Sequence, residues 1–153
     1  MKLGTAGAGY GATTATLKGG LGSASTLTAS GFTVGALVAV NAVGSVTIGD
    51  GPHFWAAPYE HGEEFGGLGL PKEISENDLR PRLKTSAQRA NTVIGCIATD
   101  ARLTKCECKR VALAAHDGLA RAIRPAHTPM DGDTLFAAAT GLKPLEKGVM
   151  DLT

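Results

Sequence analysis

The sequence lacks several features that would place it in a familiar class of protein. Its 153 residues carry a formal net charge of only +1, so no basic excess is present to attract nucleic acid or an anionic membrane. No apolar run approaches the roughly 20 residues that cross a bilayer, and the first residues lack a signal-peptide core. We therefore expect a cytoplasmic protein with neither nucleic-acid nor membrane partners.

Cysteines and aromatic residues are also scarce. Cys96, Cys106 and Cys108 form an odd set without the paired spacing of a zinc site or a disulfide framework. Residues 7–12 (GAGYGA) loosely match a dinucleotide-binding loop, but the six residues before them leave little room for the strand that such a loop requires. We expect free thiols in a reducing compartment, and neither a cofactor nor a metal. With aromatics at 5%, any core is aliphatic.

Glycine, in contrast, is plentiful, and apolar runs alternate with turn-forming stretches. The 21 glycines indicate many tight turns or close backbone approaches in a chain of single-domain length. Runs at 32–41 and 92–99 predict buried strands, and 42–48 and 134–138 predict shorter ones. Residues 4–25 are predicted to be loops around a short extended piece.

One helix is well defined by the sequence. Thr104 and Glu107 have the spacing of a capping box, and Pro125 predicts an end after Arg124. A buried stripe at helical spacing is predicted from Val111, Ala115, Leu119 and Ile123. Strands, a packed helix and further strands together indicate a layered α/β domain.

A long polar segment with four prolines interrupts this pattern between residues 49 and 90. Such long irregular stretches inside a compact domain are usually either functional or disordered. A loop that is cut during maturation is one such function.

Thr92 lies at the boundary between this polar segment and the predicted apolar strand. If the chain is cut before Thr92, one residue gains both a hydroxyl nucleophile and a free amine, whose ordinary pKa of about 7.7–8.0 suits it to accept the hydroxyl proton. The simpler alternative is a strand that begins with threonine, a common β-former. Context outside this position favours the first interpretation.

Five segments, in the right order, resemble the self-cleaving P1 peptidase family. They are residues 17–25 (LKGGLGSAS), 34–41 (VGALVAVN), the Asn91–Thr92 pair, 115–125 (AHDGLARAIRP) and 127–134 (HTPMDGDT). The family includes the D-aminopeptidase, the β-peptidyl aminopeptidases and the nylon-oligomer (6-aminohexanoate oligomer) hydrolases. The match extends from about residue 7 to residue 141, so it does not depend on a single motif.

The resemblance implies an αββα sandwich of the N-terminal-nucleophile (Ntn) hydrolase type. Family members are longer at both ends, so we expect residues 1–153 to be a single domain, incomplete at both ends. Within it, 1–91 would be the remnant of an α-subunit with its processing loop at about 49–91, and 92–153 would be the β-subunit portion. Self-association of the processed units is expected from the family.

The resemblance also assigns roles at the site. It places autocleavage between Asn91 and Thr92, with Thr92 as the nucleophile. Asp131 and Asp133 would serve as base and orienter from a turn with a central glycine, although Asp-Gly-Asp is also ordinary turn chemistry. Asn41 would donate to an oxyanion, or else simply cap its strand. Lys18 resembles the active-site lysine of the family.

Three functions remain open at this point. The first is an autoprocessed hydrolase of small peptide or amino-acid oligomer amides, of either the nylon-hydrolase or the aminopeptidase type. The second is a truncated, inactive fragment of such an enzyme that associates through exposed strands. The third is acyl transfer of the ornithine acetyltransferase kind. The sequence does not choose among α-, β- and ω-amino acid amides.

Overall fold

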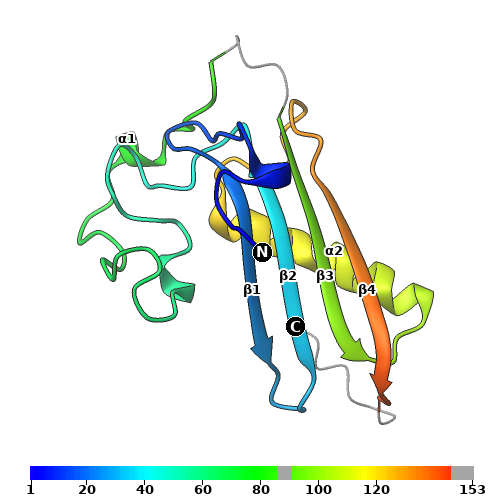
Figure 1. Ribbon diagram of the computed structural model, residues 1–153. Helices are drawn as coiled ribbons and strands as arrows, with labels where there is room; N and C mark the ends of the chain where they lie inside the picture. The colour runs from blue at the N-terminus through cyan, green and yellow to red at the C-terminus, as the bar shows by residue number, and fades with distance from the viewer. Residues whose placement is uncertain (86–90, 146–153) are drawn as a thin grey trace.

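Four strands form one mixed sheet in the order β1-β2-β3-β4. The computed structural model describes residues 1–85 and 91–145. β1 (Gly20–Leu27), β2 (Thr33–Asn41) and β3 (Thr92–Ala101) run antiparallel to one another, and β4 (Thr134–Lys143) runs parallel to β3 (Figure 1). β3 therefore has a neighbour on each side and is a central strand.

The helix α2 (Lys105–Ala122) crosses one face of the sheet and connects the parallel pair β3 and β4 (Figure 1). The expected capping box is confirmed: the Glu107 N–H donates to Thr104 Oγ1, and Glu107 Oε2 accepts from the Thr104 N–H. The helix ends at Ala122, two residues earlier than expected, because Ile123 is extended and Arg124 pairs with Ser45. Proline at 125 disfavours helical backbone at the preceding residue.

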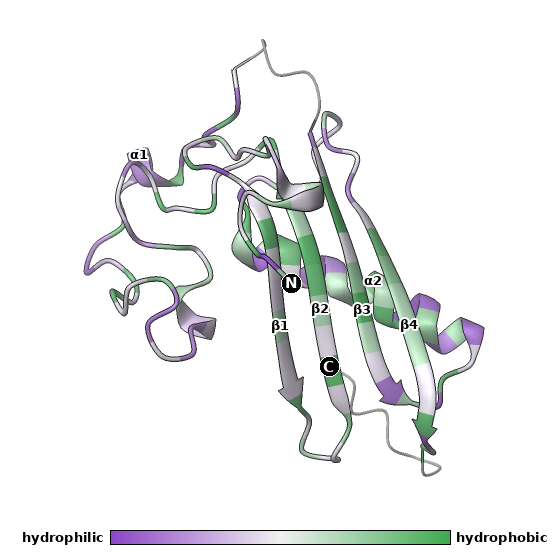
Figure 2. Ribbon diagram, in the orientation of Figure 1, coloured by the Kyte–Doolittle hydropathy of each residue, from purple (hydrophilic) through white to green (hydrophobic). Residues whose placement is uncertain are grey.

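The two faces of the sheet differ in burial. Odd positions of β3 face α2, and the core cluster there contains Ala42, Val93, Leu119 and Ile123. The opposite face carries large apolar side chains that stay exposed, including Leu27, Ile94, Phe136 and Leu142. Figure 2 shows hydrophobic residues recurring along β2, β3 and β4. The structure is thus one sheet with one helical layer.

Several expected elements differ from the structure. Residues 42–48 are mostly buried but form no strand, because their backbone groups pair singly with Arg124 and Phe54. β4 continues past residue 138, to Lys143. The turn near the acidic pair spans Thr128 to Asp131, where the Asp131 N–H donates to Thr128 O at 2.9 Å, so Asp131–Asp133 leads into β4 and is not itself the turn.

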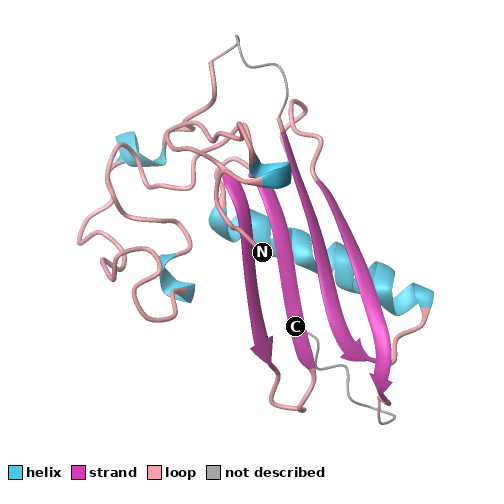
Figure 3. Ribbon diagram, viewed as in Figure 1, coloured by secondary structure: helices cyan, strands magenta, loops and turns pink. Residues whose placement is uncertain are grey.

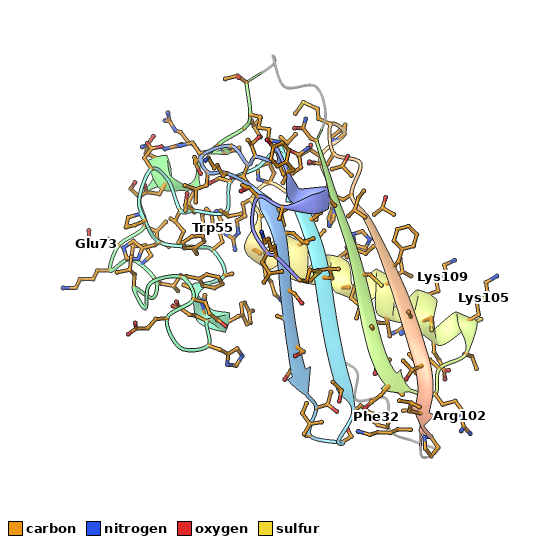
Figure 4. All side chains as sticks on the ribbon, in the orientation of Figure 1. Phe32, Trp55, Glu73, Arg102, Lys105 and Lys109 are labelled. Atoms are coloured by element: carbon orange, nitrogen blue, oxygen red, sulfur yellow. The ribbon has the colours of Figure 1, made fainter. Side chains whose placement is uncertain are left out.

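The segment from residue 49 to residue 85 is mostly irregular, as expected, with two short helices (Figure 3). These are η2 (Ala57–Tyr59) and α1 (Glu76–Leu79), in addition to η1 (Gly7–Gly9) near the start of the chain. Trp55 faces the sheet domain, where the Arg124 guanidinium lies 4.2 Å from its ring centroid, while Glu73 points outward (Figure 4). This cation–π contact anchors the segment to the end of α2.

Among the described residues, no helix is both long and apolar enough to span a bilayer.

Candidate active site

The predicted site residues converge at one end of the sheet, where β1, β3 and β4 begin and β2 ends (Figure 1). Asn41 and Thr92 are direct partners in the β2–β3 register. Directly opposite residues of an antiparallel pair have Cβ atoms about 4.5–5.5 Å apart. Asn41 and Thr92 therefore share one face of the sheet, the one opposite α2.

The peptide between Asn91 and Thr92 is held by two donors on one oxygen. Thr92 Oγ1 donates to the carbonyl oxygen of Asn91 at 2.5 Å, and the Gly132 N–H donates to the same oxygen at 2.9 Å. Asn91 is buried, and within residues 1–85 and 91–145 its Oδ1 has no hydrogen-bond partner. A buried acceptor left unpaired costs about 1–3 kcal/mol, a cost that belongs to the Asn91 side chain and not to its peptide bond with Thr92.

Position 132 requires glycine because Thr92, the candidate nucleophile, lies close to its backbone. An ideal Cβ on Gly132 would lie 2.9 Å from Thr92 Oγ1. The missing side chain lets the Gly132 N–H reach the Asn91 carbonyl while the hydroxyl stays beside it. The Gly132 N–H thus donates to the Asn91 carbonyl oxygen at an ordinary hydrogen-bond distance of 2.9 Å.

The two carboxylates flank this glycine and are both braced by backbone donors. Asp131 Oδ1 accepts from the Val43 N–H at 3.0 Å, and its Oδ2 accepts from Thr128 Oγ1 at 2.8 Å. Asp133 Oδ1 accepts from the Val93 N–H at 2.9 Å. Neither carboxylate bonds the Thr92 hydroxyl in the described part of the chain. The two aspartates instead join residues 131–133 to Val43, just beyond β2, and to Val93, at the start of β3.

Asp133 has a second partner, His127, in the same loop. Its Oδ2 lies 2.9 Å from Nδ1 of His127, and the side chain of Asp133 is only 4% exposed. His127 adopts a left-handed backbone with φ 56, which histidine tolerates better than most residues. This contact fixes the second oxygen of Asp133.

Asn41 is held by a residue that sequence reasoning missed. The Nζ of Lys84 donates to Asn41 Oδ1 at 2.8 Å, and the Thr13 N–H donates to the same atom at 3.1 Å. Burial lowers the pKa of Lys84, an effect that the negative charge of Asp131 opposes. A lone lysine in a proline-rich stretch carries no local signal for such a contact.

Lys18 is less closely involved than expected. It forms an isolated bridge with Thr13, so it lies next to a partner of Asn41. Its side chain is exposed, and within the described residues it makes no hydrogen bond or ion pair. The structure brings Thr92, Asn41, Asp131 and Asp133 together and leaves the Lys18 side chain outside that group.

A groove of about 500 Å³ opens beside Thr92 on the face opposite α2. Asn41 and Thr92 lie in its wall, and the rest is mainly apolar, including Leu21, Leu37, Ile94 and Phe136. No cluster of three potential metal ligands occurs among the described residues.

Solved structures define the class of protein. The β-aminopeptidase of Burkholderia sp. matches 97% of this chain at 28% identity with a TM-score of 0.60, although the match covers 36% of that protein. The L-aminopeptidase D-Ala-esterase/amidase of Ochrobactrum anthropi, described as a variant of the Ntn hydrolase fold, matches 90% at 25% identity, with a TM-score of 0.56 and 33% of its own length covered. The chain thus has the Ntn-hydrolase type of fold found in these aminopeptidases.

Sequence comparison gives the family. Residues 1–152 match Peptidase family S58, and the chain belongs to that family of peptide and amide hydrolases. An uncharacterized aminopeptidase of Mycobacterium tuberculosis is 48% identical over 97% of this chain and 44% of its own length. A 6-aminohexanoate-oligomer endohydrolase of Kocuria sp. is 42% identical over 39% of this chain and 17% of its own. The chain therefore spans less than half the length of the curated relatives it matches.

Proposed function

We propose that this chain carries the self-cleaving site of an N-terminal-nucleophile amide hydrolase, with Thr92 as the nucleophile. The observation that supports it best is the peptide before Thr92, whose carbonyl oxygen is contacted by both the Thr92 hydroxyl and the Gly132 N–H. A nucleophile adjacent to a carbonyl already bonded to a fixed donor is the arrangement that acyl transfer requires.

The first stage is self-cleavage. Thr92 Oγ1 attacks the carbonyl carbon of Asn91, its proton passes to a base, and the Gly132 N–H stabilises the oxyanion. The C–N bond then breaks, the Thr92 nitrogen takes up a proton, and an ester joins Asn91 to the Thr92 oxygen. Water hydrolyses this ester, which leaves a carboxylate on Asn91 and a free amine on Thr92. The two pieces are residues 1–91, the proposed α-part, and 92–153, the proposed β-part.

The second stage is turnover of an external amide. The new Thr92 amine accepts the hydroxyl proton as the oxygen attacks the substrate carbonyl, and the leaving amine takes up a proton. Water then hydrolyses the acyl-enzyme ester, which releases the acid product and regenerates the Thr92 hydroxyl. Asp131 and Asp133 hold the segment that positions Thr92, and their negative charge stabilises the ammonium that forms as the amine takes the hydroxyl proton. Asn41, opposite Thr92 in register, supplies an oxyanion donor.

The groove supports a small substrate with an aliphatic backbone. Its apolar wall next to one reactive hydroxyl suits short amides of amino acids or their oligomers, as hydrolysed by nylon-oligomer hydrolases and aminopeptidases. Acyl transfer to an acceptor amine uses the same acyl-enzyme. Product analysis with and without an acceptor amine separates the two, and dominance of transfer would contradict the hydrolase assignment.

Intact-mass measurement of the purified chain tests the proposal. We expect two polypeptides, one ending at Asn91 and one starting at Thr92, and a single uncut chain for Thr92→Ala. Thr92→Ser keeps the hydroxyl and should still cleave. Thr140→Ala, an exposed threonine on β4, is the matched control and should cleave as the wild type does.

A wild-type chain that stays uncut, and that matches Thr92→Ala in every respect, would support the inactive-fragment alternative. The exposed apolar side chains on the face opposite α2 are the observation in its favour, since such faces promote association. Sedimentation of the uncut chain would then show whether it self-associates.

A further inference from the structure

Asp133 joins two parts of the molecule through its two carboxylate oxygens. Its Oδ1 accepts from the Val93 N–H at 2.9 Å. Its Oδ2 lies 2.9 Å from Nδ1 of His127 and accepts from the His127 N–H at 3.3 Å. A carboxylate only accepts hydrogen bonds, so Nδ1 of His127 is the donor in this contact. With both oxygens bonded and a side chain only 4% exposed, Asp133 cannot rotate without losing one of these partners.

The ring of His127 is itself held against α2. It lies edge-on to the ring of His116, with the two centroids 4.8 Å apart and an interplanar angle of 61°, an arrangement that aromatic pairs favour. Its Nε2 lies 3.5 Å from the His116 carbonyl oxygen. With a left-handed backbone, His127 directs both its N–H and its ring at Asp133. His127 consequently links the helix to the carboxylate that holds Val93.

The proposed cut removes one restraint from Thr92. Before the cut, Thr92 is joined to Asn91, whose carbonyl oxygen accepts from the Gly132 N–H. Afterwards Thr92 is a chain terminus, and terminal residues are poorly ordered unless they are tied down. The β2–β3 ladder and the bond from the Val93 N–H to Asp133 remain to hold it. The contact of Asp133 with Val93 therefore matters more after the cut than before it.

We propose that His127 is a positioning residue, which acts through Asp133 to hold the new terminus at Thr92 in place for attack on the substrate. This inference rests on the proposed function. His127 packs on α2, and Val93 belongs to the core on that side of the sheet, whereas the groove beside Thr92 opens on the opposite face. His127 acts through Asp133 and not on the substrate, so its effect should fall on the chemical step and not on substrate binding.

Two substitutions separate the side chain of His127 from its backbone. His127→Gly keeps the left-handed conformation and removes the ring. His127→Asn also tolerates that conformation, and it carries an amide nitrogen in the position of Nδ1, so it can still donate to Asp133. His61→Gly, at an exposed histidine of the irregular segment, is the matched control for loss of a ring and for the backbone freedom of glycine.

Hydrolysis of the p-nitroanilides of alanine, β-alanine and 6-aminohexanoic acid by the self-cleaved chain measures the effect. A misplacement of about 1 Å can cost about 100-fold in rate, so we expect His127→Gly to lower kcat about tenfold with KM unchanged. Self-cleavage, in which Thr92 is still tethered to Asn91, should slow by about threefold at most. His127→Asn should recover part of kcat, and His61→Gly should change neither constant. A kcat of His127→Gly equal to that of the wild type, or no recovery in His127→Asn, would overturn the inference.

Amide hydrogen exchange in the uncut Thr92→Ala chain is a measurement that does not depend on activity. Adding His127→Gly should speed exchange of the Val93 N–H, while amides farther along β3 keep their rates, which separates local loosening from loss of folding. Unchanged exchange at Val93 would overturn the inference, whatever the kinetics. If the wild type never cleaves, or cleaves and hydrolyses none of the three amides, but Val93 responds, the proposed function fails at that stage while the hold of His127 on the start of β3 stands.

Discussion

The backbone of Gly132 and the hydroxyl of Thr92 share the same carbonyl oxygen, that of Asn91. The Gly132 N–H reaches this oxygen at 2.9 Å, and Thr92 Oγ1 lies 2.9 Å from the point where a Cβ on Gly132 would stand. A residue with a side chain at position 132 must therefore displace either the hydroxyl or the donor. This contact joins residues 131–133 to the start of β3.

Gly132→Ala should block or strongly slow self-cleavage with little loss of stability. The added methyl group displaces the Thr92 hydroxyl, which can rotate, while the backbone of Gly132 has no positive φ that would strain an alanine. We expect at least a 100-fold fall in the cleavage rate, followed by intact mass over time. Cleavage at the wild-type rate would mean that the hydroxyl does not need its present position.

Asp133→Asn should destabilise the chain by about 1–3 kcal/mol, because the new NH₂ group would confront donors in a buried position. Asp133 is 4% exposed and accepts from Val93 and His127. Urea unfolding measures the change. Asp117→Asn, on an exposed part of α2, is the matched control and should leave the midpoint unchanged. Equal midpoints for the two variants would show that the contacts of Asp133 with Val93 and His127 do not contribute to stability.

Gly44→Ala should cost about 1–3 kcal/mol through overpacking. A Cβ there would meet Pro125 O at 2.2 Å and Arg124 C at 2.8 Å, both of them backbone atoms that cannot rotate away. Gly118→Ala on α2 meets nothing within 4 Å and should instead stabilise by about 0.5–1 kcal/mol. Thermal unfolding of the two variants should thus shift in opposite directions, and shifts of the same sign would contradict the packing at Gly44.

Stability should fall in acid partly through Asp100. Its hydrogen bond with Lys143, at 2.9 Å, and a bond from the Thr33 N–H lower the pKa of Asp100. The folded state therefore keeps this carboxylate charged at a pH where the unfolded chain takes up a proton. The contribution is present above about pH 4 and is lost as the pH falls through the lowered pKa. Asp100→Asn should flatten the difference in urea midpoint between pH 6 and pH 2, and an unchanged difference would exclude Asp100 as a cause.

Local patterns predicted the elements that are determined locally. The capping box of Thr104 and Glu107 and the strand from Thr92 were both recognised, because a few neighbouring residues specify them. The buried run at 42–48 resembles a strand in sequence, yet the Val43 N–H pairs with Asp131 and Ser45 pairs with Arg124. Those partners lie far along the chain and are invisible to any short window.

The site shows the same difference between features set by a local motif and features set by residues far along the chain. Asn91, Thr92, Asn41 and the acidic pair came from motifs, and the structure brings them to one end of the sheet. The roles of these residues remain predictions. The hold of Lys84 on Asn41 could not be predicted, because it depends on how an irregular segment folds back onto β2. Lys18 showed the reverse: its motif was clear, yet its exposed side chain makes no hydrogen bond or ion pair within the described residues.

The β2–β3 ladder would span the proposed cut, pairing Val34 to Asn41 on one fragment with Thr99 to Thr92 on the other. Severing the chain before Thr92 would therefore turn an intramolecular sheet into a joint between two polypeptides. Main-chain hydrogen bonds along a whole strand, and a shared core beneath it, would keep the halves in one particle. They should copurify under native conditions and part only when the sheet itself melts.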